Sequence, residues 1–377
     1  MAEAAPSVLL AVEQLRRRVP GGIGNYARGL LSGLQRCADQ GEGVELTLLA
    51  SRPSGRTPDP LAAYGRPLVT SALPGPLMTR AWDHSVLRAP EGFAVVHSVS
   101  LAAPMLRRRS RSRLAVTVHD LAWRRHPEAT TARGRRWHEA ALCRVRDCGA
   151  HLVAPSLLVA ADLVALGVDE HRITVVRGGT DHLVPPDADA TTALLERVGV
   201  HGDYLLTVGT LEPRKNLVRL VRAFSRARAR LPEPWPLVIV GPTGWGRAAR
   251  PPETRGVVFT GSVADAVLSG LYGRARAFAY VPLTEGYGLP PLEAMSSGAP
   301  SVVSTEVPSV HDLGENDPPP ARIVDPLDIG DMAAGLVDVL TDETLRGDLA
   351  ARGSSFASAR TWQAAAGEHV RLWRQLA

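Results

Sequence analysis

The chain has 377 residues, more than the roughly 250 to 300 that a single hydrophobic core usually organises, so two domains are expected. Hydrophobic residues make up 45% and charged residues 21% of the chain, a globular composition that excludes an intrinsically disordered protein. The excess positive charge lies in residues 1–190, and 5% aromatic residues without a nucleic-acid module pattern argue against binding of RNA or DNA.

The cysteines and the N-terminus indicate the compartment. Three cysteines form no paired motif, and their odd number argues against a disulfide framework and favours a reducing cytosol. The first residues lack a basic segment, and the apolar run after them ends at Glu13, too short for a signal peptide or a membrane span. A cytoplasmic, non-spanning protein is expected.

Arginines are clustered in the first half of the chain. The densest groups are Arg107, Arg108, Arg109, Arg111 and Arg113, followed by Arg133, Arg135 and Arg136. They form either a solvated surface in an arginine-biased chain or a patch that contacts anionic lipid or an anionic acceptor. Peripheral contact with the inner face of a membrane is therefore left open.

Short β-branched runs alternate with segments of helical length along the whole chain. In the first half, strands are expected near 8–12, 44–49, 94–97, 114–119, 151–154 and 173–176. In the second half, they are expected near 204–208, 237–240, 257–260, 277–281, 301–303 and 322–324. This alternation predicts an α/β protein with two parallel, Rossmann-like sheets covered by helices.

The domain boundary is expected in a segment rich in glycine and proline. Gly178-Gly179 and residues 182–192 have the composition of a linker, which places the boundary near residue 190. The domains are then 1–190 and 191–377, with a last helix over about 361–377 whose packing back on the N-terminal domain is left open. Ligands of open α/β sheets bind at the carboxyl ends of strands, so the chemistry is expected in a cleft between the domains.

The segment GTLEPRKN (209–216) holds the only lysine of the chain, Lys215. It follows a predicted strand, Pro213 suits the first position of a helix, and an amphipathic pattern continues beyond it. Lys215 is therefore expected in the first turn of a helix, where exposed amides and the helix dipole already favour an anion. A surface lysine paired with Glu212 is the alternative, and we favour anion binding.

The segment TEGYGLPPLEAMSSGAPSVVS (284–304) follows another predicted strand. It combines a glycine-containing loop that carries Glu285, a helix start at Pro290-Pro291, Glu293 in the first turn and Gly298 as the C-cap. Two carboxylates beside a helix N-terminus suit sugar or ribose hydroxyls, while the loop amides suit a phosphate. A glycosidase acid and nucleophile pair is the alternative, but it needs carboxyls on opposite sides of a scissile bond.

A glycine-rich segment near the N-terminus, Gly22-x-Gly24-x-x-Ala27, formally matches the dinucleotide-binding fingerprint. Residues 13–20 separate it from the first strand, and the second strand is followed by Ser51-Arg52 where an acid is expected. The match is therefore weak, and an NAD-dependent oxidoreductase stays an alternative. A loop whose amides approach a phosphate or sugar is favoured.

Two further pairs of polar residues can be interpreted either as functional or as structural. His119 and Asp120 close a predicted strand, where His119 can bind a hydroxyl or act as acid or base; a capping Asp beside a structural His is equally compatible. Asp187-x-Asp189 matches a metal–diphosphate motif but lies in the linker, and we interpret it as incidental. No residue set has convincing metal-ligand spacing, so neither a metal nor another cofactor is expected.

Taken together, four segments resemble the retaining glycosyltransferase family 4 of the GT-B fold. They are YLLTVGTLEPRKNLVRLVRAF, EGYGLPPLEAMSSGAPSVVS, GGIGNYARGL and VTVHDL with the HPE that follows it. The resemblance implies two Rossmann-like domains facing a cleft and metal-independent transfer of a sugar from a nucleotide-sugar donor to an acceptor hydroxyl. It also implies retention at the anomeric carbon, by front-face attack with a donor phosphate oxygen as base. The C-terminal domain would bind the donor and the N-terminal domain the acceptor.

Matching motif positions assigns roles to individual residues. The resemblance implies that Lys215 neutralises the donor diphosphate, Glu285 contacts the donor sugar and His119 lies near the reacting centre. Glu293 would contact the ribose, and Gly261-Ser262-Val263 would lie near the base. The other implied donor-binding residues are Gly22, Gly24, Thr210, Arg214, Gly286, Tyr287, Gly288 and Leu289. Many members have arginine where this chain has Thr210, so Lys215 is expected to act with Arg214 or another arginine.

The combination of GTLEPRKN with VHDL resembles mannosyl- and rhamnosyltransferases of polysaccharide or glycolipid assembly. GDP-mannose is therefore the leading donor, ahead of dTDP-rhamnose and UDP-sugars. The acceptor is expected to be a glycan, a lipid-linked molecule or a small molecule. A non-catalytic protein that binds a nucleotide sugar remains a second alternative.

Overall fold

The protein is described by a computed structural model that covers residues 5–17, 20–53, 55, 58–244, 251–311 and 317–377. Residues 1–4, on which the expectation about the N-terminus partly rests, lie outside the described residues. The chain forms two compact units. Unit 1 comprises residues 1–123, 131–182 and 361–377, and unit 2 comprises residues 124–130 and 183–360.

The division between the units differs from the predicted boundary. Contacts divide the chain after residue 182, whereas residue 190 lies inside helix α6 (Ala188–Arg197). The expected linker therefore passes directly into secondary structure, because the Asp187 carboxylate accepts a hydrogen bond from the Ala190 amide and caps α6 (2.9 Å). This cap also gives the first residue of the Asp187-x-Asp189 motif a structural role.

Each unit is built on a parallel sheet. The strand order is β3-β2-β1-β4-β5-β6-β7 in unit 1 and β10-β9-β8-β11-β12-β13 in unit 2. In unit 1 the strands are β1 (Ser7–Ala11), β2 (Glu45–Ala50), β3 (Leu68–Thr70), β4 (Val95–Ser98), β5 (Arg113–Thr117), β6 (His151–Ala154) and β7 (Ile173–Val175). In unit 2 they are β8 (Leu205–Val208), β9 (Leu237–Val240), β10 (Val257–Gly261), β11 (Ala277–Tyr280), β12 (Ser301–Ser304) and β13 (Arg322–Val324). The two Rossmann-like α/β sheets are as predicted, and each reverses its direction of progression at one point, between β1 and β4 and between β8 and β11.

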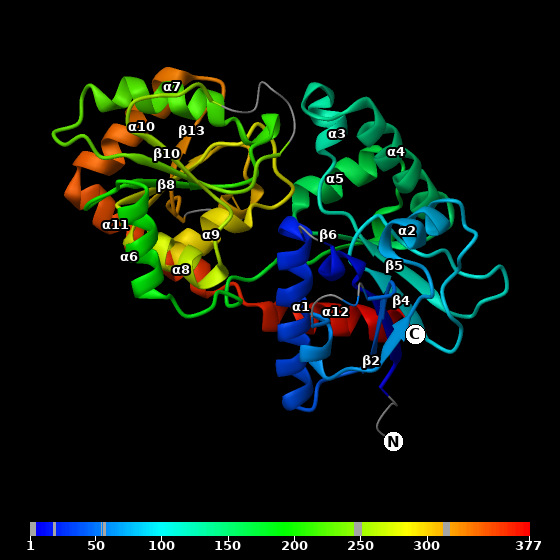
Figure 1. Cartoon of the computed structure of the whole chain (residues 1–377). Coiled ribbons are helices and arrows are strands. Elements are labelled where there is room, and N and C mark those ends of the chain that lie inside the picture. Colours follow the sequence, from blue (N-terminus) through cyan, green and yellow to red (C-terminus); the bar gives the residue numbers. More distant parts are fainter. Residues whose placement is uncertain (1–4, 18–19, 54, 56–57, 245–250, 312–316) are drawn as a thin grey trace. The chain divides into compact units, whose positions relative to one another are not determined.

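The helices of unit 1 cover both faces of its sheet. They are α1 (Gly21–Asp39), α2 (Gly75–Asp83), α4 (Ala132–Asp147), α5 (Leu157–Ala165) and α12 (Trp362–Leu376), and the short α3 (Ala122–Arg125) spans the division between the units. One hydrophobic cluster joins α2, α4 and α5 to alternate strand residues such as Val96 and Val116. The residues next to these, His97 and Thr117, face the side on which α1 and α12 pack (Figure 1).

The helices of unit 2 also lie in two layers. They are α6 (Ala188–Arg197), α7 (Leu217–Arg228), α8 (Asp265–Arg274), α9 (Leu289–Ser296), α10 (Ile329–Thr341) and α11 (Glu343–Ser358). One cluster joins α7 and α10 to Leu205, Leu237 and Ala277, while another joins α6, α8 and α9 to Leu206, Val238 and Phe278. Successive strand residues thus alternate between two apolar layers, which is why strands such as LVIV (237–240) are continuously hydrophobic. Figure 1 shows α7 beside α10, and α6 beside α8.

The C-terminal helix α12 belongs to unit 1, where it packs against α1 and crosses it (Figure 1). Glycines make the close approach possible. A Cβ atom added to Gly29 would lie 2.0 Å from the Trp362 ring, and one added to Gly33 would lie 2.1 Å from the Trp362 carbonyl oxygen. Trp362 is itself fully buried, so α12 contributes to the core of the unit that begins the chain.

A buried chain of hydrogen bonds fixes α12 to the sheet. Trp373 Nε1 donates to His97 Nδ1 (3.0 Å), so the His97 Nε2–H group is left to donate to the Thr117 hydroxyl (3.0 Å). His369 Nδ1 donates to the Ala365 carbonyl (2.8 Å), so its Nε2 accepts from the Tyr26 hydroxyl (2.9 Å). Both imidazoles therefore fit this chain only in the neutral form.

The stability of the protein is expected to fall in mild acid because His369 is buried. Burial lowers the pKa of His369 to about 4, against an ordinary value of 6.5. As the pH falls below 6.5, His369 becomes protonated in the unfolded state but stays neutral in the folded state. The free energy of unfolding should therefore fall by about 2 kcal/mol between pH 7 and pH 5. Urea unfolding of the wild type and of His369→Gln measures this, since the variant should lose that part of the pH dependence. An exposed-site control, His84→Gln, should retain it; equal pH dependence in wild type and His369→Gln would contradict the assignment.

Among the helices that the structure describes, none combines the length and the apolar character that crossing a bilayer requires.

Candidate functional site

The strongest candidate site lies in unit 2 where the strand order reverses. β8 and β11 are neighbours there, and each is followed by a loop at the same edge of the sheet because the two strands are parallel. The loop after β8 contains the GTLEPRKN segment, and the loop after β11 contains Glu285. Ligands of open α/β sheets bind in the crevice at such a point.

The loop after β8 forms a short turn before the long helix. Pro213–Lys215 is a 3₁₀ turn (η5), and α7 starts only at Leu217. The prediction that Lys215 lies in the first turn of the long helix is therefore wrong. Asn216 interrupts the helical path with a left-handed conformation (φ +58°), and its side-chain amide donates to the Val281 and Pro326 carbonyls. Asn216 thereby attaches η5 to the loop after β11.

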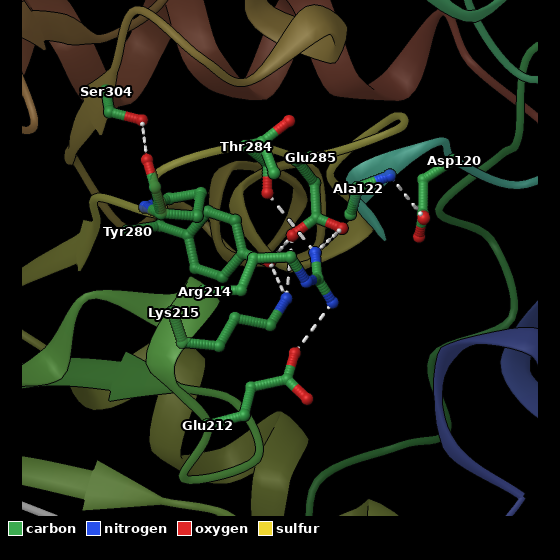
Figure 2. Close-up of polar contacts among 10 residues, drawn as sticks. Asp120, Ala122, Glu212, Arg214, Lys215, Tyr280, Thr284, Glu285 and Ser304 are labelled. Carbon is green, nitrogen blue, oxygen red and sulfur yellow. Dashed lines mark hydrogen bonds and ion pairs between the residues drawn. The ribbon is translucent and has the colours of Figure 1, made fainter. Parts of the chain in front are cut away.

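Lys215 and Glu285 meet in a compact polar cluster. Lys215 Nζ lies 2.7 Å from Glu285 Oε2 and 2.6 Å from the Tyr280 hydroxyl, which in turn donates to Glu285 Oε2 (2.7 Å). Arg214 contacts the other oxygen, Glu285 Oε1, at 2.8 Å, and it also pairs with Glu212 at 2.8 Å. Figure 2 shows the four charged groups converging. The cluster thus joins two cations to two carboxylates and is electrically balanced.

The surroundings keep Glu285 ionised. Burial by itself would raise the pKa of Glu285, but the charges of Arg214 and Lys215 outweigh it and hold the pKa far below its usual range. Burial and the neighbouring Arg214 lower the pKa of Lys215, against the opposing effect of Glu285 and Glu212. Burial, and then Glu285, raise the pKa of Tyr280, so its hydroxyl stays protonated and donates. A further anion beside Lys215 and Arg214 would therefore meet two cations that are already paired with carboxylates.

The loop from Glu285 into α9 is fixed by backbone contacts. Gly288 has a φ of +103°, and a Cβ atom there would lie 2.4 Å from the Val307 side chain, so the position requires glycine. Ser309 holds the loop by donating its amide to the Tyr287 carbonyl (2.9 Å) and its hydroxyl to the Gly288 carbonyl (2.8 Å). α9 begins at Leu289, and the next two residues are prolines without N–H groups, so its first turn offers few amide donors.

Glu293 lies in a separate environment. It is the fifth residue of α9, not part of the first turn as predicted, because the helix starts at Leu289. Its carboxylate is buried and accepts a hydrogen bond from the Tyr272 hydroxyl of α8 (2.9 Å). Burial, and then Glu293, raise the pKa of Tyr272, which keeps this donor protonated. A role at the donor ribose stays a prediction.

Of the other predicted residues of unit 2, Gly261 to Val263 lie at the end of β10 and in the loop after it, and Thr210 lies in the loop after β8. Gly261 ends β10 with a φ of +72°, and its carbonyl accepts from the Gly241 amide (3.0 Å). Ser262 is exposed, and Val263 packs partly on the apolar core. Thr210 lies against the β9 loop, since a Cβ atom on Gly244 would be 2.7 Å from its methyl group. β8, β9 and β10 are adjacent parallel strands, so these loops share one edge of the sheet.

The glycine-rich segment of unit 1 is helical and not the expected loop. α1 begins at Gly21, so Gly22 and Gly24 lie in its first turns. Pro20 precedes it with helical backbone angles and accepts a hydrogen bond from the Gly24 amide (3.2 Å). A Cβ atom on Gly24 would lie 2.2 Å from Pro20 Cβ, whereas Gly22 faces open space. A contact of Gly22 or Gly24 with a phosphate or sugar stays a prediction.

His119 follows β5 and is partly buried. Its Nε2 donates to the Val99 carbonyl (2.7 Å), and its ring stacks edge-on against Tyr26 (4.8 Å). Burial lowers the pKa of His119, so the ring is neutral near pH 7 and its Nδ1 atom is the proton acceptor. Asp120 accepts from the Ala122 amide (3.0 Å), which is the capping role considered for it.

Sequence reasoning missed three polar residues of the site. Tyr280 bridges Lys215 and Glu285, Asn216 fixes η5, and Tyr272 supports Glu293. Two of them have a weak signal: Tyr280 ends an otherwise apolar strand, and asparagine is among the non-glycine residues most tolerant of a left-handed conformation. Among the described residues, no group of three or more His, Cys, Asp or Glu side chains has an arrangement that could hold a metal ion. Metal independence stays a prediction.

Two family descriptions match the chain. "Glycosyltransferase Family 4" matches residues 20–182, and "Glycosyl transferases group 1" matches residues 202–342. The O-antigen chain mannosyltransferase B of Escherichia coli is 27% identical over 275 residues, which is 70% of this chain and 71% of that protein. The serotype-specific mannosyltransferase WbdA of Escherichia coli is 32% identical over 185 residues, 46% of this chain but only 22% of that longer protein.

A solved structure has the same fold. HepE of Anabaena, in complex with UDP and glucose, superposes with a TM-score of 0.70 at 15% sequence identity, covering 98% of this chain and all of that one. At this identity the likeness concerns the fold alone.

Proposed function

Because the chain belongs to glycosyltransferase family 4 of the GT-B fold, we propose that it transfers a hexose from a nucleotide-sugar donor to an acceptor hydroxyl with retention at the anomeric carbon. The observation that carries this proposal is the convergence of Lys215 and Arg214 on Glu285 at the strand reversal of unit 2. Two cations at the carboxyl edge of a parallel sheet suit a diphosphate, and a neighbouring carboxylate suits sugar hydroxyls.

The cluster suggests how the chain's own residues assist bond cleavage. Breaking the anomeric C–O bond builds negative charge on the leaving diphosphate, and preorganised cations stabilise that charge more than the ground state. Glu285 holds Lys215 and Arg214 side by side at this edge of the sheet before the donor arrives. When they turn to the diphosphate, the Glu285 carboxylate gains capacity to accept hydroxyl hydrogens of the sugar.

The two cations supply the positive charge that a divalent metal provides in other transferases, which is the basis for proposing metal-independent transfer. No carboxylate in the cluster lacks a cationic partner, which disfavours a carboxylate nucleophile and favours front-face attack with a donor phosphate oxygen as base. The proposal also gives places to three other parts of the chain. Glu293 would contact the ribose, Gly261 to Val263 would lie beside the base, and His119 would lie near the reacting centre.

Mannose is the proposed sugar, with GDP-mannose as the leading donor. Mannosyltransferases among the curated relatives support this choice, as does the pairing of GTLEPRKN with VHDL. dTDP-rhamnose and UDP-sugars rank behind, and the acceptor is a glycan, a lipid-linked molecule or a small molecule.

A thermal-shift panel followed by an assay of donor hydrolysis and transfer tests the proposed function. GDP-mannose should raise the melting temperature more than UDP-glucose, dTDP-rhamnose or NAD, and the protein should then release GDP. A shift with NAD alone would favour an oxidoreductase. Binding of GDP-mannose without hydrolysis or transfer would indicate a non-catalytic binding protein.

A further inference from the structure

A cavity of about 1440 Å³ opens in unit 1 beyond the carboxyl ends of β1 and β2. Glu13 reaches it from the turn after β1, and Ser51 and Arg52 follow β2 directly. Further lining residues come from α2, from the segment that contains Asp59 and from the first turns of α4. The cavity is large enough for a ligand of one or two sugar rings with a substituent.

Two of the carboxylates that line the cavity are already paired. Asp59 accepts from Arg16 (Nε to Oδ1, 3.0 Å). Asp83 accepts from Arg144 (2.6 Å) and from the Trp137 indole (2.8 Å). These acids are therefore not available to neutralise further cations at the cavity.

Four arginines of the lining have no such partners: Arg17, Arg52, Arg80 and Arg133. All four are exposed, and none of them lies within ion-pair distance of any carboxylate in the described part of the chain. Arg133 also lies in the first turn of α4, which contains no acidic residue. A cation at this end of a helix opposes the helix dipole, so the arrangement favours a bound anion.

The lining also has a surface suited to the uncharged part of a sugar. Glu13 is buried, and one carboxylate oxygen accepts from the Ser51 amide (2.7 Å), while the other lies beside Gly75, where a Cβ atom would be 2.3 Å away. A carboxylate so placed accepts hydrogen bonds from hydroxyl groups. Leu77, 54% exposed, adds apolar surface.

Resting on the proposed function, we infer that this cavity takes the acceptor and that the acceptor is a sugar or polyol that carries a phosphate group. Guanidinium groups bind phosphate bidentately, and a group of unpaired arginines matches a dianion better than a singly charged carboxylate. Glu13 would then orient the hydroxyl-bearing part of the acceptor.

Titration calorimetry on the full chain tests the binding class directly. The probes are mannose 6-phosphate, mannose, glucuronate, and vesicles of phosphatidylglycerol or phosphatidylcholine. Mannose 6-phosphate should bind at least about 10-fold more tightly than mannose or glucuronate, as expected for hydrogen bonds to a charged group. Equal affinity for mannose, or binding confined to phosphatidylglycerol vesicles, would overturn the inference.

Single substitutions test three of the four unpaired arginines. Arg52→Ser, Arg80→Ser and Arg133→Ser should each weaken mannose 6-phosphate binding by about 10-fold, whereas Arg109→Ser, an exposed arginine outside the cavity, should not. In transfer assays the three variants should raise the acceptor KM with little change in kcat. Variants that match Arg109→Ser in both measurements would contradict the inference. The thermal shift with GDP-mannose reports the donor site separately, so its absence would count against the proposed function and not against the cavity.

Discussion

Replacing Lys215 by alanine is expected to reduce sugar transfer by about 100- to 1,000-fold, the usual cost of removing one preorganised group that stabilises developing charge. Lys215 and Arg214 are the two cations of the cluster, so the loss of the ammonium removes half of the positive charge at the proposed diphosphate site. Glu285 keeps Arg214 and Tyr280 as partners, and the fold should therefore survive. Steady-state kinetics with GDP-mannose, with circular dichroism as a check on folding, measures the effect.

Two further variants make the Lys215 test specific. Arg222→Ala removes an exposed cation from α7 and should leave transfer unchanged. Lys215→Arg should give an intermediate rate, because a planar guanidinium cannot place one compact charge at both the Tyr280 hydroxyl and Glu285 Oε2. Near-normal turnover by Lys215→Ala would show that Lys215 does not stabilise the leaving diphosphate.

Replacing Glu285 by glutamine is expected to move binding and turnover in opposite directions. The substitution removes one negative charge from a balanced cluster, which leaves Lys215 and Arg214 with one carboxylate between them. GDP should then bind more tightly, by up to about 10-fold, because it no longer competes with a carboxylate for the cations. Transfer should nevertheless fall by about 100-fold, because the hydrogen bonds from a charged acceptor to the sugar are lost.

Calorimetric titration of GDP, read beside the turnover of the same protein, separates these effects. Weaker GDP binding by Glu285→Gln would mean that Glu285 does not hold the cations back from the phosphates. Unchanged turnover would mean that it does not act on the sugar. Glu343→Gln is the matched control, since this exposed glutamate also pairs with two arginines but lies on α11.

Much of the fold could be predicted because buried parallel strands are short, continuous apolar runs. All twelve predicted strands are present, with ends that differ by at most two residues. β3 was missed because Leu68–Thr70 is a three-residue edge strand that is only partly buried. The meeting of the Lys215 and Glu285 loops was also predictable, since both follow parallel strands and must emerge at one edge of the sheet.

The details of the cluster were not predictable from local pattern. Helical periodicity runs through PRKNLVRLV, but Asn216 breaks it by contacts with residues far along the chain, Val281 and Pro326. Nothing in the sequence indicates that Tyr280 completes a triangle with Lys215 and Glu285. Long-range contacts of this kind decide side-chain partners without leaving a periodic signal.

Long-range contacts also explain why the buried histidines of unit 1 were not predicted. His97 and His369 are separated by most of the chain, and their pairing depends on α12 returning to the unit that contains α1. Sequence spacing singled out His119 instead, because it stands at a strand end, where polar residues are conspicuous. Buried polar networks become visible only when the topology is known.

A crystal structure of the chain with bound GDP tests the central claim most directly. We expect the diphosphate to lie within hydrogen-bond distance of Lys215 Nζ and the Arg214 guanidinium, with Glu285 displaced from at least one of these cations. A diphosphate bound elsewhere, for example at the start of α1 beside Gly22, with the Lys215–Glu285 pair unchanged, would contradict it.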